Sequence, residues 1–122
     1  MEAFTNTIDI GGQKARYYDL SSLNTSANNK TKCLRAHFYG GNGFTVGNYK
    51  PLLTELAAGF DISSLAMRGY WYDQPKARIL TREQDADLLI QFLEQTQDGP
   101  VIGIGHSQGA TATAMAAAKR PD

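Results

Sequence analysis

The sequence has a single cysteine, Cys33, and only two histidines, His37 and His106, among its 122 residues. One cysteine excludes an internal disulfide framework and a cysteine-based zinc site. Neither sign of charge is in excess, because 12 lysines and arginines balance 12 aspartates and glutamates. A balanced charge gives no basic surface for nucleic acid or an anionic membrane. We expect neither of these partners, and no metal or other cofactor.

Long apolar runs are also missing. No run approaches the roughly 20 residues that span a bilayer, and the segment from Met1 to Thr5 lacks the basic and apolar regions of a signal peptide. Hydrophobic residues make up 42% of the chain, a share that is typical of a folded protein rather than a disordered one. We therefore expect one soluble, cytoplasmic domain over residues 1–122.

The order of short apolar segments and helical patterns predicts the fold class. Gly11 and Gly12 join two alternating segments and indicate a β-hairpin. Beyond a polar loop at 21–31 the pattern predicts strand, helix, strand, helix, strand and helix, which indicates an α/β fold with a parallel sheet. The predicted strands are residues 33–38, 61–67 and 101–104, and the predicted helices begin near Asn48, at Thr81 and at Ala110.

Local signals place the first two helices and the last strand. Asn48 is a good N-cap residue, and Thr81 with Gln84 forms the sequence pattern of a capping box. The apolar run Val101–Ile104 suits a parallel strand covered on both faces. The side chains expected to be buried are Leu52, Leu53, Leu56 and Ala57 in the first helix, and Ala86, Leu89, Phe92 and Leu93 in the second.

The segment Gly105-His106-Ser107-Gln108-Gly109 has the pattern G-x-S-x-G between the last predicted strand and the last predicted helix. In that context the motif predicts a sharp turn that exposes the Ser107 hydroxyl above the sheet. Gly105 and Gly109 remove Cβ atoms that would clash in such a turn. The backbone N–H of Gln108 can then face a developing oxyanion. The alternative is a glycine-rich turn in which the serine only caps the helix.

A second alternative is dinucleotide binding, because Gly103, Gly105 and Gly109 approach the spacing of the G-x-G-x-x-G fingerprint. That fingerprint normally follows the first strand of its unit, with an acidic residue about 20 positions later. Here two strand-helix units come first, and the sequence ends before such a residue. The serine turn is therefore the preferred interpretation.

Taken together, these segments resemble the α/β-hydrolase family of serine esterases and hydrolases. The resemblance implies the N-terminal half of an α/β-hydrolase fold and hydrolysis of an ester, thioester or similar acyl bond of a small molecule. It implies that Ser107 is the nucleophile and that the N–H groups of Gln108 and Asn42 form the oxyanion hole. Gly40-Gly41 replaces the His-Gly pair that is frequent in the family. The similar stretches, within residues 32–122, are 37–44, 49–53, 68–69 and 101–109.

The histidine and the acid that the family places after the nucleophile are missing. No histidine follows Ser107; His106 adjoins it, and His37 is expected to be a buried or loop-anchoring residue. The last strand would also form an apolar edge with unpaired backbone groups. We therefore expect a truncated or split hydrolase, inactive alone, with a complementing chain or a second copy at the edge strand as its partner. The alternative is a non-catalytic fragment or pseudoenzyme.

Overall fold

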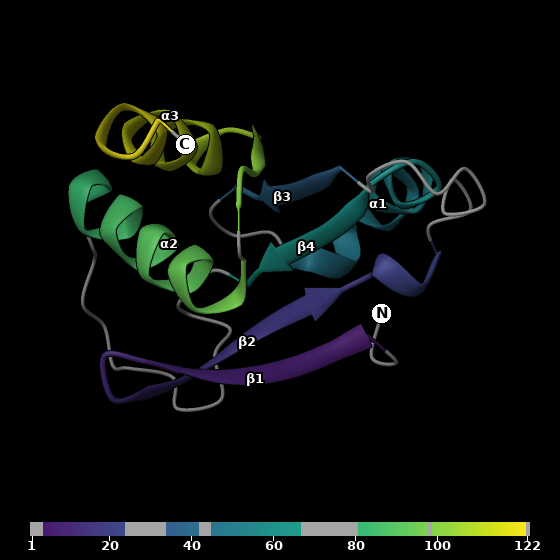
Figure 1. The fold of residues 1–122 in the computed structure, drawn as a ribbon, viewed down its shortest axis with the longest axis horizontal. Coiled ribbons are helices and arrows are strands. Elements are labelled where there is room, and N and C mark those ends of the chain that lie inside the picture. Colours follow the sequence, from purple (N-terminus) through teal and green to yellow (C-terminus); the bar gives the residue numbers. More distant parts are fainter. Residues whose placement is uncertain (1–3, 24–33, 42–44, 67–80, 98, 122) are drawn as a thin grey trace.

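The computed structural model describes residues 4–23, 34–41, 45–66, 81–97 and 99–121. Cys33 and Asn42 lie outside the described residues. The described strands form one five-stranded sheet in the order β1-β2-β4-β3-β5, flanked by helices (Figure 1). The strands are β1 (Thr5–Ile10), β2 (Gln13–Asp19), β3 (Arg35–Tyr39), β4 (Asp61–Leu65) and β5 (Ile102–Gly105). The helices are α1 (Lys50–Ala57), α2 (Arg82–Thr96) and α3 (Gln108–Lys119), with short 3-10 helices η2 (Ser21–Leu23) and η4 (Val46–Tyr49).

The predicted hairpin and the predicted parallel sheet are both present. β1 and β2 pair antiparallel through Gly11 and Gly12, whose φ angles of 59° and 82° are those of a tight hairpin turn. β2 pairs antiparallel with β4, and β3 pairs parallel with both β4 and β5. The α/β class predicted from the sequence is therefore confirmed.

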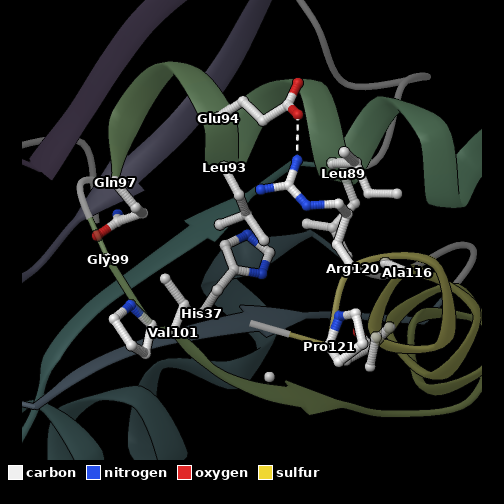
Figure 2. Close-up of a pocket in the computed structure, with 15 residues that line it drawn as sticks. His37, Leu89, Leu93, Glu94, Gln97, Gly99, Val101, Ala116, Arg120 and Pro121 are labelled. Atoms are coloured by element: carbon white, nitrogen blue, oxygen red, sulfur yellow. Dashed lines mark hydrogen bonds and ion pairs between the residues drawn. The ribbon is translucent and has the colours of Figure 1, made fainter.

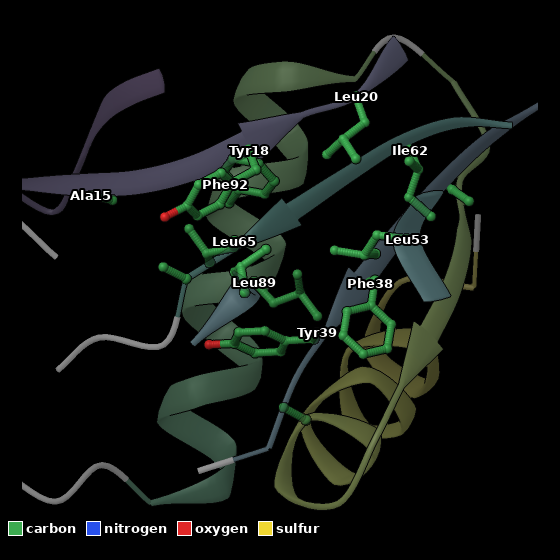
Figure 3. Packing of buried hydrophobic residues seen from close by; sticks show 14 of the residues in the cluster. Ala15, Tyr18, Leu20, Phe38, Tyr39, Leu53, Ile62, Leu65, Leu89 and Phe92 are labelled. Atoms are coloured by element: carbon green, nitrogen blue, oxygen red, sulfur yellow. The ribbon is translucent and has the colours of Figure 1, made fainter. Parts of the chain in front are cut away.

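Helices cover both faces of the sheet. Successive side chains of a strand point to opposite faces, and β3 shows which helix covers each face. The His37 ring packs on Phe92 of α2 at 5.4 Å, whereas the next residue, Phe38, packs on Tyr49 before α1 at 4.7 Å. Figure 1 shows α2 and α3 together on one face and α1 on the other. The core lies on both sides of β3 and β4 (Figure 3).

The capping box at the start of α2 is confirmed. The Gln84 N–H donates to Thr81 Oγ1 at 3.1 Å, and the Thr81 N–H donates to Gln84 Oε1 at 2.9 Å. These bonds satisfy two N–H groups that a helix start leaves without partners. The helix buries Ala86, Leu89 and Phe92 as predicted, while Leu93 is half-buried.

The start of α1 differs from its prediction. Thr45 is the N-cap of η4, and the Asn48 side chain accepts the Thr45 N–H at 2.9 Å. Asn48 is therefore part of the cap of η4 and not the N-cap of α1, which begins at Lys50. The buried residues of α1 are Leu53 and Ala57. Leu52 is 44% exposed, so the prediction that it is buried was wrong.

β5 lies at an edge of the described sheet. Among the described strands it pairs only with β3, and Ile102 is 44% exposed. The prediction of a strand covered on both faces was therefore wrong for the described part of the chain, because no described strand or helix covers Ile102. The apolar edge predicted for this strand is present.

Candidate functional site

Ser107 lies in the turn between β5 and α3, and its backbone is in a conformation that serine rarely adopts. Its φ and ψ angles are 57° and −125°, and it is the sole described residue other than glycine with a positive φ. Such a conformation costs of order 1–3 kcal/mol. The Ser107 side chain is exposed and makes no capping hydrogen bond to α3. The helix-cap alternative therefore lacks the hydrogen bond that defines it.

The two glycines of the serine turn (residues 105–109) are fixed by close packing. A Cβ on Gly105 would lie 2.7 Å from the backbone N of Ala110. A Cβ on Gly109 would overlap the carbonyl oxygens of Tyr39 and Gly40 at the end of β3. Backbone atoms of the chain therefore fill the space that a side chain would need at both positions. This packing explains the two glycines without a bound dinucleotide.

Backbone hydrogen bonds hold the serine turn against β3. The His106 N–H donates to the Tyr39 carbonyl oxygen at 3.1 Å, and the Ala110 N–H donates to the Ser107 carbonyl oxygen at 3.0 Å. Gln108 is the first residue of α3, where the helix itself supplies no acceptor for the N–H. No described group accepts from this N–H either. The Gln108 N–H is therefore available to an anion, and the positive end of the helix dipole would stabilise an anion bound there.

Tyr49 connects the serine turn to the loop after β3. Its hydroxyl lies 2.9 Å from Nδ1 of His106 and accepts a hydrogen bond from the Gly41 N–H at 2.8 Å. The rings of Tyr49 and His106 also meet edge to face at 5.6 Å. Gly41 directly precedes Asn42, so the described part of this loop ends beside the serine turn. This role could not be predicted from the sequence, because Tyr49 and His106 are far apart in the chain.

His37 is a core residue, as predicted. It is 1% exposed, and its Nε2 accepts a hydrogen bond from the Leu65 N–H at 3.0 Å. Burial lowers its pKa to about 3, which keeps the ring neutral at physiological pH. Its Nε2 lone pair is occupied by a backbone donor inside the sheet, so His37 is not placed to accept a proton from Ser107.

Asp85 on α2 is a buried carboxylate that was not predicted. It is 2% exposed, and its Oδ1 accepts a hydrogen bond from the Tyr39 hydroxyl at 2.5 Å. Burial raises the pKa of Asp85, while the hydrogen bond from Tyr39 opposes that shift. Burial also raises the pKa of Tyr39, with the neighbouring Asp85 adding to the effect.

One cavity of the described structure lies away from Ser107. It has a volume of about 420 Å³ and lies between α2, α3 and the start of β5 (Figure 2). Arg120 and Glu94 form an ion pair beside it. Its lining includes Val101 and Gly103 but not Ser107. Ligands of α/β sheets bind at the carboxyl ends of the strands, and Ser107 rather than this cavity lies at that end of β5.

The described residues contain neither a cluster of metal-ligating side chains nor a helix that could span a membrane. No group of three or more His, Cys, Asp or Glu side chains in the described ranges could hold a metal ion. None of the described helices is long and apolar enough to cross a membrane.

Solved structures with a similar fold exist. A bacterial membrane phospholipase A, described as a virulence factor, matches with a TM-score of 0.79 at 16% identity, over 96% of this chain and 36% of its own. The hydrolase of E-2-(acetamidomethylene)succinate matches with a TM-score of 0.76 at 23% identity, over 97% of this chain and 40% of its own. The Cif epoxide hydrolase from Acinetobacter nosocomialis matches with a TM-score of 0.67 at 19% identity, over 95% of this chain and 34% of its own.

No protein-family model matches the chain, and no curated protein matches it. The similarity to known proteins therefore rests on the solved structures, and at 16–23% identity these show the fold alone. The chain spans roughly two fifths or less of each matched structure.

Proposed function

We propose that this chain, which has the fold of the N-terminal part of α/β-hydrolase enzymes, supplies the nucleophile of a serine hydrolase acting on acyl bonds. The observation that carries the proposal is the backbone of Ser107. A positive φ of 57°, at an exposed serine between a strand and a helix, is the strained turn that presents a nucleophile above the sheet. Strained residues of this kind concentrate at functional sites.

The reaction follows from the groups around Ser107. Its Oγ attacks the acyl carbon and loses its proton to a base, while the carbonyl π electrons move to the oxygen. The Gln108 N–H, which has no described acceptor, would donate to this oxyanion together with the Asn42 N–H. Collapse of the intermediate breaks the bond to the leaving group, which takes the proton from the base. Water then hydrolyses the acyl-serine ester with the same base.

The choice of an acyl substrate rests on the chemistry of serine. Two of the similar enzymes are named as a phospholipase and a succinate-derivative hydrolase, but another is named as an epoxide hydrolase. Attack of a serine hydroxyl on an epoxide carbon would give an ether, which water does not cleave. Attack on an acyl carbon gives an ester, which water does cleave. A serine at this position therefore favours an ester, thioester or similar acyl bond.

The base and its orienting acid are supplied from outside these 122 residues. His37 is buried with its Nε2 occupied by the Leu65 N–H, and His106 pairs with Tyr49. No other histidine is present in the sequence. Without the base and acid, a serine site retains at most about 10³–10⁴-fold acceleration over water. We infer that a complementing segment or chain provides both groups.

The test is covalent labelling of the purified chain with a fluorophosphonate probe, with and without added imidazole as a replacement base. We expect imidazole to promote labelling, and peptide mass spectrometry to locate the label at Ser107. Ser107→Ala should abolish the labelling. Ser21→Ala, at an exposed serine outside the site, should leave it unchanged. Folded protein that stays unlabelled at Ser107 in the presence of imidazole would overturn the proposal.

A further inference from the structure

Tyr39 joins α2 to the serine turn. At one end of this residue, the hydroxyl donates to Asp85 of α2 at 2.5 Å. At the other end, its carbonyl oxygen accepts the His106 N–H at 3.1 Å and occupies the space that a Cβ on Gly109 would need. Tyr39 therefore contacts the serine turn on both sides of Ser107. Figure 3 shows its ring in the core, with the hydroxyl directed toward α2.

The Asp85–Tyr39 pair is an unusual way to fill this part of the core. Both residues are 2% exposed or less, and in the described part of the chain the carboxylate has one hydrogen-bond donor, the Tyr39 hydroxyl. Taking a carboxylate out of water is costly even when it is paired. Two apolar side chains of similar shape would fill the same space without that cost. Stability of the core is therefore a weak reason for this pair.

Geometry offers a stronger reason. The hydrogen bond to Asp85 and the surrounding core hold the Tyr39 ring in place, and the side chain is bonded to the Cα atom beside the last peptide group of β3. The carbonyl oxygen of that peptide group accepts the hydrogen bond from the His106 N–H. Ser107 directly follows His106 in the chain. Catalytic groups must be held within about 0.5 Å of their productive positions. An acceptor on α2 would thus help to set the position of a residue on a different element.

We propose that Asp85 is a positioning residue for Ser107 and acts through Tyr39. Its role in catalysis rests on the proposed function, whereas its control of the geometry of the serine turn does not. In the absence of Asp85 the Tyr39 hydroxyl loses its partner, the end of β3 relaxes, and the His106 N–H and the Ser107 backbone shift with it.

The test compares stability with local geometry. The double variant Asp85→Leu/Tyr39→Phe removes both polar groups, and a purely structural account predicts that it changes unfolding and nothing at the serine turn. We expect the double variant to be as stable as the parent or more stable in urea. We also expect the amide NMR signals of His106, Ser107 and Gln108 to move, and imidazole-promoted labelling of Ser107 to slow about tenfold or more.

Three single variants complete the test. Two of them are controls, and the third, Tyr39→Phe, keeps the test decisive if the double variant fails to fold. Asp85→Asn retains an acceptor for the Tyr39 hydroxyl and should leave the turn signals close to those of the parent. Thr96→Val removes a side-chain hydrogen bond from the opposite end of α2 and should not move them. Tyr39→Phe alone should move them. Unchanged turn signals in Tyr39→Phe and in the double variant would overturn the proposal.

The NMR signals also separate the two proposals. They require a folded chain but no reactivity, so they report on Asp85 even if Ser107 does not react. If Ser107 of the parent chain is not labelled while the signals move as expected, the proposed function fails and the positioning role remains.

Discussion

The Tyr49 hydroxyl lies 2.9 Å from Nδ1 of His106, although the two residues are 57 positions apart in the chain. The same hydroxyl accepts the Gly41 N–H, so one side chain holds the loop after β3 beside the serine turn. In the proposed function these two segments provide the two sides of the oxyanion hole. Tyr49 is thus expected to matter for the site without contacting the substrate.

The Tyr49→Phe variant tests this connection. It removes the acceptor of the buried Gly41 N–H and the hydrogen-bond partner of His106, so we expect a loss of roughly 1–3 kcal/mol in the free energy of unfolding. Tyr18→Phe is the matched control, because the Tyr18 hydroxyl bonds to no described group. Urea denaturation of both variants measures the difference. Equal stabilities for the two variants would contradict the role given to Tyr49.

Because the serine turn packs closely on β3, we expect one added methyl group at Gly109 to lower the free energy of unfolding strongly. In Gly109→Ala the new Cβ would overlap the carbonyl oxygens of Tyr39 and Gly40, and backbone atoms cannot move aside cheaply. We expect a loss of about 3 kcal/mol or more. Gly59→Ala places a methyl group in open space and should be neutral or slightly stabilising. A tolerated Gly109→Ala would mean that the turn does not pack as described.

At Ser107, in contrast to Gly109, glycine and not alanine is expected to be the more stable substitution. Glycine adopts positive φ without penalty, so Ser107→Gly should relieve the strain stored at φ 57°. Strain of about 1–3 kcal/mol exceeds the extra unfolded-state entropy of glycine, about 0.4–1 kcal/mol. We expect Ser107→Gly to be more stable than Ser107→Ala by about 1 kcal/mol. The reverse order in chemical denaturation would argue against a strained turn.

Because His37 is buried as a neutral ring, we expect the free energy of unfolding to decrease in acid. Burial lowers its pKa from 6.5 to about 3, so below pH 6.5 the unfolded chain binds a proton that the folded chain does not. Its contribution is therefore complete above pH 6.5 and is lost as the pH falls toward 3, by up to about 1.4 kcal/mol per pH unit. His37→Gln retains an acceptor for the Leu65 N–H but does not titrate. Urea denaturation at about pH 7 and about pH 5 should show a smaller decrease for this variant.

The parts of the fold that were predicted correctly depend on residues close together in the chain. Thr81 and Gln84 are three positions apart, so their capping box could be predicted without knowing the fold. Gly11 and Gly12 fix a hairpin turn by themselves, and the G-x-S-x-G pattern marks the serine turn. The order of these local signals was enough to predict the N-terminal part of an α/β-hydrolase fold, which the structural matches confirm.

Apart from the start of α1, the errors and omissions concern contacts between distant segments. The helical spacing of apolar residues suggested that Leu52 is buried, and the apolar run Val101–Ile104 suggested the same for Ile102. Each is 44% exposed, because burial depends on which element lies opposite. The Tyr39–Asp85 hydrogen bond joins residues 46 positions apart, and no sequence pattern links a strand-end tyrosine to an aspartate in a helix. The contact between Tyr49 and His106 escaped prediction for the same reason.

Trapping of an acyl-enzyme shows whether Ser107 is a nucleophile for acyl groups. The purified chain would be treated with a p-nitrophenyl ester and imidazole, then digested and mapped by peptide mass spectrometry, with Ser107→Ala in parallel. We predict that the acyl group is found on Ser107 when the reaction is quenched early, before imidazole assists hydrolysis of the ester, and is absent from that position in the variant. Acyl groups scattered over lysines, with Ser107 of the folded chain unmodified, would show that Ser107 is not the nucleophile.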